Sequence, residues 1–470
     1  MNRWNAFIIV AFAHRLLNAA DPKIAIVSPA SNTCVPVAER VFVIGSVTPP
    51  DTPFTVNGQT VTVWRTGGFL YMAPVNRGTN TLVCRAGAAE HRHTFTVPFP
   101  ASAWDGKSLR AQQPLQPLGV YTGETVNLAC RAPAGRAVCA SIGERTILLS
   151  AHASDSTLYS GRVTFPFPVE AVPVIFYSDG FSDAPASTLT ACPAWPTYRV
   201  TGPLFETRVR SEPGAGDTVG FLPPDFLVQG AGYSGSHIRL WLAGLRRFVE
   251  TRHVTPVEGR APPRRDQPVP DLSAGFDPHP PTNRTPAGVL IVLDPGHGGA
   301  STGAVGPTGL TEKEANLKQA RIVKTVLERA GFNVLMTRDT DLDLDLYERV
   351  RLAYSKKAAA FISIHYNSCG ASGNPRTSRH IATYAWNGIG LHLAHALHPH
   401  LAAATPIQDG GVHTDSFAVC RNPAVPSCLL ELDFITCPEG EEALQQPDRQ
   451  RRVAEAILAG LRDWLTPPAP

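Results

Sequence analysis

The chain has 470 residues, with 42 lysines and arginines against 39 aspartates and glutamates, a net charge of +3 and no long basic run. This balance argues against binding nucleic acid through a basic surface, and no apolar run is long enough to predict a membrane-spanning helix. The length predicts several domains. A charged fraction of 17% and 43 prolines favour linked β-rich modules over a helical or disordered protein.

Residues 1–20 have the pattern of a secretory signal peptide. Arg3 supplies the positive start, residues 6–13 (AFIIVAFA) the apolar segment, and residues 17–20 (LNAA) the small side chains before a cleavage point. His14 next to an arginine interrupts the apolar segment, so an ordinary amino-terminal strand remains the alternative. Nine cysteines also fit an oxidising compartment. We therefore expect a secreted or periplasmic protein.

Three β-rich modules are predicted next. Residues 22–100 contain short apolar runs and an Asn57-Gly58 hairpin signal, and they loosely resemble an immunoglobulin-like β-sandwich. Residues 105–198 predict a second β-sandwich, and residues 204–257 are similar to SH3-like modules. Residues 259–286 are rich in proline and predict an extended linker. None of the modules contains clustered titratable groups, so we expect them to serve targeting rather than catalysis.

The last region, residues 287–466, predicts an α/β domain with a mainly parallel sheet. Buried apolar strands alternate with amphipathic helices, an order that implies right-handed crossovers. Strands are expected at 289–293, 333–337, 359–364, 381–386 and 428–434, and helices at 315–330, 344–357, 390–403 and 451–465.

Four side chains of this domain suggest metal chemistry. His297 follows the first strand in a glycine loop, His365 ends the third strand, and Glu312 begins the first helix. Two imidazoles and one carboxylate make a catalytic zinc set that leaves one position for water. Glu431, on a separate strand, is a second carboxylate that could accept the proton of that water. There is no HExxH motif, so the fold would have to bring these residues together.

Simpler interpretations remain open at this point. Thr311 and Glu314 fit a helix capping box, and Glu312 would then be a surface residue favoured by the helix dipole. Two further sets of polar residues could bind a second metal or a cation, although a polar helix face and solvated turns explain them as well. These sets are His392, His395 and His398 with His413, and Asp339, Asp341, Asp343 and Asp345.

Ordered motifs in this domain carry a family resemblance. The motifs are LDPGHGG (293–299), GLTEKEANL (309–317), TRDTD (337–341), ERV (348–350), SIHYN (363–367) and LLELDF (429–434). Together they resemble the zinc-dependent N-acetylmuramoyl-L-alanine amidase family of the amidase_3 type, over residues 287–466. The resemblance implies a mixed α/β sheet, a Zn2+ cofactor and peptidoglycan as substrate. It assigns the zinc ligands to His297, Glu312 and His365 and the catalytic glutamate to Glu431.

The chain departs from the family pattern at two positions. Ser301 stands where the family usually has aspartate, and Tyr366 where it has a small residue; both departures bear on substrate fit. The stretch 367–381 is short, so it predicts no blocking helix of the kind that regulated members carry. Two other functions remain: a cell-wall binding protein with a degenerate catalytic domain, and a zinc carboxypeptidase acting on peptide stems.

Overall fold

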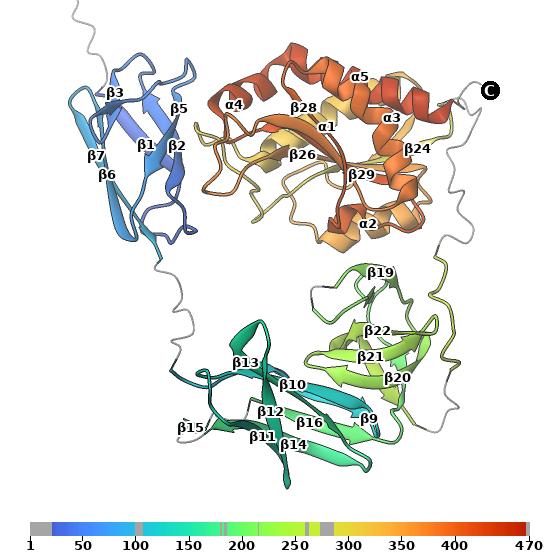
Figure 1. The fold of residues 1–470 in the computed structure, drawn as a ribbon. Coiled ribbons are helices and arrows are strands. Elements are labelled where there is room, and N and C mark those ends of the chain that lie inside the picture. Colours follow the sequence, from blue (N-terminus) through green and yellow to red (C-terminus); the bar gives the residue numbers. More distant parts are fainter. Residues whose placement is uncertain are drawn as a thin grey trace, which may run out of the picture.

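The computed structural model describes residues 21–98, 107–178, 181–182, 186–214, 216–258, 263–272 and 286–466. The predicted signal segment, 1–20, lies outside these residues. Figure 1 shows a β-rich amino-terminal part and a carboxyl-terminal α/β domain. Helices of the described residues are all too short or too polar to cross a membrane. All nine cysteines are among the described residues, and all are free thiols.

The first β module is a two-sheet sandwich. One sheet has the order β1-β2-β5 and the other β4-β3-β6-β7. Its strands are β1 (Lys23–Ser28), β2 (Arg40–Thr48), β3 (Phe54–Val56), β4 (Gln59–Thr60), β5 (Gly68–Pro74), β6 (Gly78–Ala86) and β7 (Ala89–Val97). The hairpin predicted at Asn57 and Gly58 is confirmed, and both residues have the positive φ that its turn requires.

The second and third β modules share one continuous set of strands. β9 (Leu118–Tyr121) pairs with β16 (Ser187–Cys192) of the second module and with β20 (Leu227–Ser234) of the third. β17 (Thr197–Val200) pairs with β20 and with β23 (Val254–Val257). The third module therefore begins before residue 198, earlier than the sequence predicted. The boundary was missed because these pairings join segments far apart in the chain.

The remaining strands of this region complete the two modules. They are β8 (Arg110–Gln113), β10 (Thr125–Arg131), β11 (Val138–Ile142), β12 (Arg145–His152), β13 (Asp155–Thr164), β14 (Val169–Ser178), β15 (Phe181–Ser182), β18 (Arg208–Arg210), β19 (Thr218–Phe221), β21 (His237–Leu242) and β22 (Leu245–Glu250), with a short 3-10 helix η1 (Thr251–His253). Residues 263–272 of the predicted linker form no helix or strand. Val269 packs on the core of the third module, so this part of the linker lies against that module.

The α/β domain contains a six-stranded sheet with the order β25-β24-β26-β29-β27-β28. Its strands are β24 (Leu290–Pro295), β25 (Asn333–Met336), β26 (Ala360–Asn367), β27 (His380–Ala385), β28 (Gln408–Thr414) and β29 (Ser427–Phe434). Only the β27–β29 pair is antiparallel. The predicted mainly parallel sheet is confirmed, whereas β28 was not predicted, because Asp409, Gly410 and Gly411 give it no apolar pattern.

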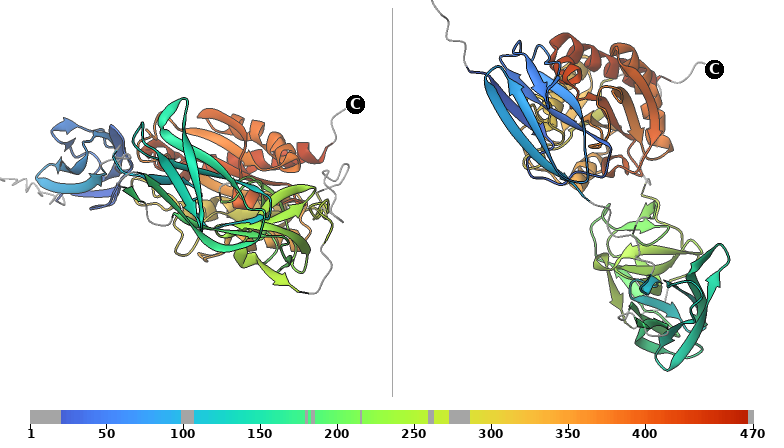
Figure 2. Two further views of the ribbon diagram at one scale, coloured as in Figure 1. Left: turned by 60° about the horizontal axis from the view of Figure 1, so that its bottom comes forward. Right: turned by 60° about the vertical axis from the view of Figure 1, so that its left-hand side comes forward.

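Helices cover both faces of this sheet (Figures 1 and 2). They are α1 (Glu312–Arg329), α2 (Leu346–Ser355), α3 (Gly388–Ala404), α4 (Pro438–Gln445) and α5 (Pro447–Leu465), with a 3-10 helix η2 (Ala418–Cys420). α1, α3 and α5 pack on one face through a large apolar core, and α2 and η2 pack on the other. On β26, Ile362 and Ile364 belong to the first core and Phe361 to the second. This double burial explains the uninterrupted apolar strands in the sequence.

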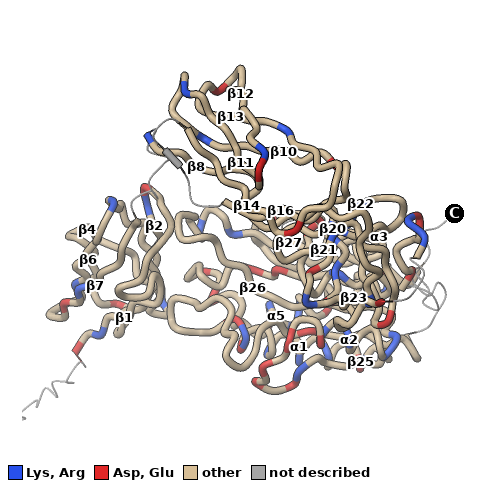
Figure 3. The backbone as a smooth tube through the Cα atoms, turned by 90° about the horizontal axis from the view of Figure 1, so that it is seen from below, with Lys and Arg blue, Asp and Glu red and all other residues tan. Residues whose placement is uncertain are grey.

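Charged side chains are spread over the modules rather than gathered by sign. Figure 3 shows Lys and Arg interspersed with Asp and Glu along the backbone. This distribution agrees with the low net charge of +3.

Candidate metal centre

His297 lies in a tightly held loop just beyond β24. Its φ is +62°, in the left-handed region that non-glycine residues rarely adopt. The Arg349 guanidinium donates to the carbonyl of His297 at 2.9 Å, and Arg338 donates to the carbonyls of Pro295 and Gly296, each at 2.9 Å. Two buried guanidinium groups thus fix the loop conformation, which is how a strained backbone persists at a functional site.

A buried carboxylate anchors this network. Asp294 is fully buried at the end of β24, and it accepts hydrogen bonds from Arg349 Nη1 at 2.8 Å, Thr337 Oγ1 at 2.6 Å and Ser363 Oγ at 2.7 Å. The motifs TRDTD and ERV therefore include the partners of the LDPGHGG loop. No role was predicted for Asp294. The available signal was an aspartate at the end of a buried apolar strand, since buried charges need partners.

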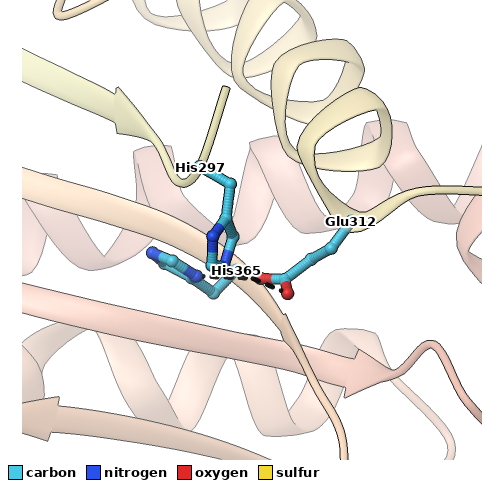
Figure 4. Close-up of side chains that lie close together, drawn as sticks. All are labelled: His297, Glu312 and His365. Carbon is cyan, nitrogen blue, oxygen red and sulfur yellow. Dashed lines mark hydrogen bonds and ion pairs between the residues drawn. The ribbon is translucent and has the colours of Figure 1, made fainter. Parts of the chain in front are cut away.

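Glu312 brings the two histidines together (Figure 4). Its Oε2 lies 3.2 Å from His297 Nε2, and its Oε1 lies 2.8 Å from His365 Nδ1. One candidate ligand atom from each of the three residues lies within 4.8 Å of the other two. Glu312 is only 5% exposed, so its interpretation as a surface residue is wrong. The predicted capping interaction does form, because Glu314 accepts from Thr311 N and Oγ1.

The Glu312 carboxylate is also held by donors of the protein. Ala304 N lies 2.9 Å from Oε2, and Tyr366 N and Asn316 Nδ2 each lie 3.3 Å from Oε1. Burial by itself raises the pKa of Glu312, but the hydrogen bonds and charges of the two histidines outweigh it and lower the pKa below the usual range. The carboxyl is therefore ionised at neutral pH and available as a ligand.

Two glycines leave the space that this arrangement requires. A Cβ on Gly303 would lie 2.4 Å from Glu312 Oε2, and a Cβ on Gly296 would lie 2.1 Å from the His365 ring. A buried ionised carboxylate between two imidazole nitrogens, with no room for a further side chain, is a donor set that suits Zn2+. The residues present therefore fit the metal that the sequence suggested.

Glu431 lies next to the three candidate ligands but is not one of them. On the parallel strands β26 and β29, His365 and Glu431 are directly opposite in register. Glu431 Oε2 is buried and has no hydrogen-bond partner among the described residues. Burial, and secondarily the charge of Glu312, raise the pKa of the Glu431 carboxyl well above its usual value. An unpartnered carboxyl next to a candidate ligand is suited to exchanging a proton.

The other candidate residues have different surroundings. Within the described residues, no second group of three or more His, Cys, Asp or Glu side chains gathers as a metal site would. His398 is buried and contacts Thr383 Oγ1 at 2.9 Å and Asp409 Oδ1 at 2.7 Å, so its interpretation as part of a polar helix face is wrong. Asp341 accepts from Gly299 N at 2.8 Å, and Asp345 caps α2.

Comparison with known proteins identifies the family. The family model described as N-acetylmuramoyl-L-alanine amidase matches residues 291–463. The uncharacterised protein YqiI of Bacillus subtilis (strain 168) is 34% identical over 177 residues, covering 38% of this chain and 85% of that protein. This chain belongs to the N-acetylmuramoyl-L-alanine amidase family. The match confirms the resemblance read from the ordered motifs.

Named members of the amidase family match the same domain. The amidase LytC of Bacillus subtilis (strain 168) is 36% identical over 173 residues, covering 37% of this chain and 35% of that protein. The amidase AmiC of Neisseria meningitidis serogroup B (strain MC58) is 29% identical over 243 residues, covering 43% of this chain and 58% of that protein. The chain thus spans about a third of the length of LytC and somewhat over half of the length of AmiC. The catalytic domain of CwlV from Bacillus (Paenibacillus) polymyxa var. colistinus is 34% identical, with 38% of this chain and 98% of that domain covered and a TM-score of 0.36.

The two departures from the amidase motifs have structural roles. Ser301 Oγ lies 3.0 Å from His297 Nδ1, on the side of the ring away from Glu312. Tyr366 is 1% exposed and belongs to the main core, with its hydroxyl 3.4 Å from Gln319 Oε1. Ser301 therefore contacts a candidate ligand and Tyr366 fills the core. The effect of these two positions on substrate fit stays a prediction.

Proposed function

We propose that this chain hydrolyses the amide bond between N-acetylmuramic acid and L-alanine in peptidoglycan, with zinc as its cofactor. The observation that carries the proposal is the convergence of His297, Glu312 and His365 beside the unpartnered carboxyl of Glu431. A catalytic domain that had lost its activity would not need all four of these side chains. Family membership supports the particular amide bond, and the geometry supports the class of reaction.

The three converging side chains would hold Zn2+. The chemistry that this metal supplies in such a set is Lewis-acid polarisation of a carbonyl and a pKa for water lowered to about 7. Glu312 remains ionised because the histidines lower its pKa. The amide donors of Ala304 and Tyr366 orient its two oxygens. The loop network of Arg338 and Arg349 holds His297 in place without substrate.

Glu431 would handle the protons. Its carboxylate accepts a proton from the attacking water at Oε1 or Oε2 and returns that proton to the amino group of L-alanine as the C–N bond breaks. Glu431 thus acts first as a general base and then as a general acid, and the same proton serves both steps. His365, opposite in register, keeps Glu431 close to the same reaction centre.

The remaining parts fit a protein of the bacterial cell wall. We retain residues 1–20 as a signal peptide and the secreted or periplasmic location. The two-sheet arrangement of the first module supports an immunoglobulin-like assignment, and the short strands of the third support an SH3-like one. Peptidoglycan is the proposed partner of these modules as well as the substrate.

One experiment separates the three candidate functions. Purified full-length protein is assayed for zinc content and incubated with soluble muropeptides, and the products are identified by mass spectrometry. Release of peptides with a free L-alanine amino terminus, leaving a free carboxylate on the lactyl group, is expected. Loss of a terminal amino acid would indicate the carboxypeptidase. Binding to sacculi without any cleavage would indicate the degenerate wall-binding protein.

A further inference from the structure

The first β module lies against the catalytic domain at α4 and at the loops that follow β24 and β26. Figure 1 shows it next to α4, the helix that follows β29. α4 contacts β5 of the module. A Cβ on Gly68 in β5 would lie 3.1 Å from Pro307 Cβ and 3.7 Å from Pro438 Cβ, so the two surfaces meet closely. Pro307 belongs to the loop between β24 and α1, which also contains His297.

One contact joins the module to the loop that follows His365. The amide of Phe42 in β2 donates to the carbonyl of Ala371 at 3.0 Å. β1 pairs with β2 only as far as Ile44, so the Ala371 carbonyl accepts from an amide that lies beyond the end of β1. Ala371 packs against the core of the module, and Cys369 packs against Phe42, Ile44 and Leu70. The loop after β26 therefore completes part of the module.

A second contact joins the module to α4. Trp64 Nε1 donates to Glu442 Oε2 at 2.5 Å, and Arg65 forms an ion pair with the same carboxylate. The Glu442 side chain is only 11% exposed. These two partners lower the pKa of Glu442, Arg65 contributing most. Removing both partners would leave a mostly buried charge unpaired, so the contact is specific rather than incidental.

α4 also contacts the loop that contains His297. The preceding residue, Glu441, accepts from Thr308 N at 3.1 Å and from Thr308 Oγ1 at 2.7 Å. In the same loop, Ala304 N donates to Glu312. One glutamate of α4 thus binds the module and its neighbour binds the loop that orients a candidate ligand. The other loop starts at Ser368, directly after β26 and three residues after His365.

We propose that the first β module is a positioning part of the active site, which holds the 299–311 and 368–379 loops around the metal ligands. This role differs from the targeting function that the sequence suggested for all three modules. The expected change in kcat rests on the proposed amidase function. The expected change in hydrogen–deuterium exchange does not depend on it.

The test uses full-length protein with the paired substitution Trp64→Phe and Arg65→Gln. Hydrogen–deuterium exchange is expected to rise in residues 299–311 and 368–379, while β6 and β7 stay protected. With a small soluble muropeptide, kcat is expected to fall about tenfold, since residues that orient metal ligands typically matter by about 10–100-fold, whereas KM changes little. Arg85→Gln is the matched control, because Arg85 pairs with Glu90 on β6 and β7, away from α4.

A second variant approaches the contact from the catalytic domain. Glu442→Gln keeps the size of the side chain and removes its charge, so it should loosen the same two loops without altering the module. Unchanged exchange in both loops for the two variants would overturn the proposal, as would unchanged kcat alongside increased exchange. If Trp64→Phe and Arg65→Gln together unfold the module, the proposal is tested by exchange and kcat of the Glu442→Gln variant alone. If wild-type protein shows no hydrolysis, the proposed function fails while the exchange data still test the contact.

Discussion

His365 and Glu431 lie opposite each other on the neighbouring parallel strands β26 and β29. Their side chains therefore leave the sheet on the same face. His365 also contacts Glu312, whose charge contributes to the raised pKa of Glu431. The two glutamates thus belong to one electrostatic unit but have different partners. They should respond differently to substitution.

The first prediction concerns proton transfer. Glu431→Gln preserves size and removes the proton acceptor, so we expect zinc content near that of wild type and a turnover lower by about 10²–10⁴-fold. The melting temperature should not fall, because the wild-type Oε2 has no partner to lose. Zinc analysis, thermal melting and turnover are measured on the same preparation. Near-normal turnover by the metal-replete variant would eliminate Glu431 as the base.

The second prediction concerns metal binding. Glu312→Ala removes one of three candidate ligands and leaves His297 and His365 without the carboxylate that joins them. We expect zinc occupancy to fall at limiting metal, and turnover to fall with it. Titration with zinc in the presence of a competing chelator measures the affinity. An affinity equal to that of wild type would show that Glu312 is not a ligand.

The third prediction concerns pH. Burial raises the pKa of Glu431 above its unfolded value, so between about pH 4.3 and the folded pKa this carboxyl holds more proton in the native metal-free protein than in the unfolded chain. The contribution of Glu431 to the free energy of unfolding should then decrease as pH rises through this window, by up to about 1.4 kcal/mol per pH unit. Glu312 acts in the opposite direction and at lower pH, because its pKa is lowered.

This pH dependence is tested by urea unfolding of the full chain after treatment with a chelator. Unfolding of the catalytic domain is followed between pH 5 and pH 7. Glu431→Gln is the comparison, since it removes the raised carboxyl of Glu431 and keeps every histidine and the raised carboxyl of Glu441. The stability difference between variant and wild type should grow with pH. Parallel stability profiles would contradict a raised pKa at Glu431.

Much of the catalytic domain could be predicted from the sequence, because its signals are local. Apolar β-branched runs marked β24, β26 and β29, and the glycines of LDPGHGG marked the end of a strand. Parallel strands present their carboxyl ends at one edge of the sheet, so His297 and His365 were expected to meet there. Glu312 was a candidate ligand from the sequence, but its assignment required the family resemblance, since a first-turn glutamate alone is equally compatible with the helix dipole.

What was missed depends on contacts between distant segments. The partners of Asp294 come from β26, α2 and the segment after β25. The pairing of β9 with β20 joins residues more than 100 positions apart. His398 has a regular helical spacing with two exposed histidines, but its own environment is set by Asp409 on β28. Neither composition nor periodicity records such pairings.

The fourth prediction follows from the buried pair of Asp294 and Arg349, whose side chains are 1% and 3% exposed. Asp294→Asn leaves the Arg349 charge without its counter-ion, and breaking a buried ion pair costs about 3–5 kcal/mol. The variant should be destabilised by about this amount in chemical denaturation. Glu328→Gln is the control, because its pair with Lys324 on α1 is exposed and is worth about 0.3–0.5 kcal/mol. Equal effects of the two substitutions would refute a structural role for the buried pair.

The last prediction concerns Ser301, whose hydroxyl lies 3.0 Å from His297 Nδ1. A partner on the far nitrogen of a ligating histidine fixes its tautomer and raises its basicity, and removing such a partner typically costs about 10–100-fold in metal affinity or activity. Ser301→Ala should therefore weaken zinc binding. Ser301→Asp should strengthen it, because a carboxylate accepts the imidazole proton more strongly than a hydroxyl does. Thr302→Ala controls for loop stability, since the Thr302 hydroxyl bonds the Gly303 carbonyl rather than a ligand. Zinc affinity that decreases from Asp to Ser to Ala at position 301 would support Ser301 as the group that orients His297. Three equal affinities would show that His297 is oriented by its backbone alone.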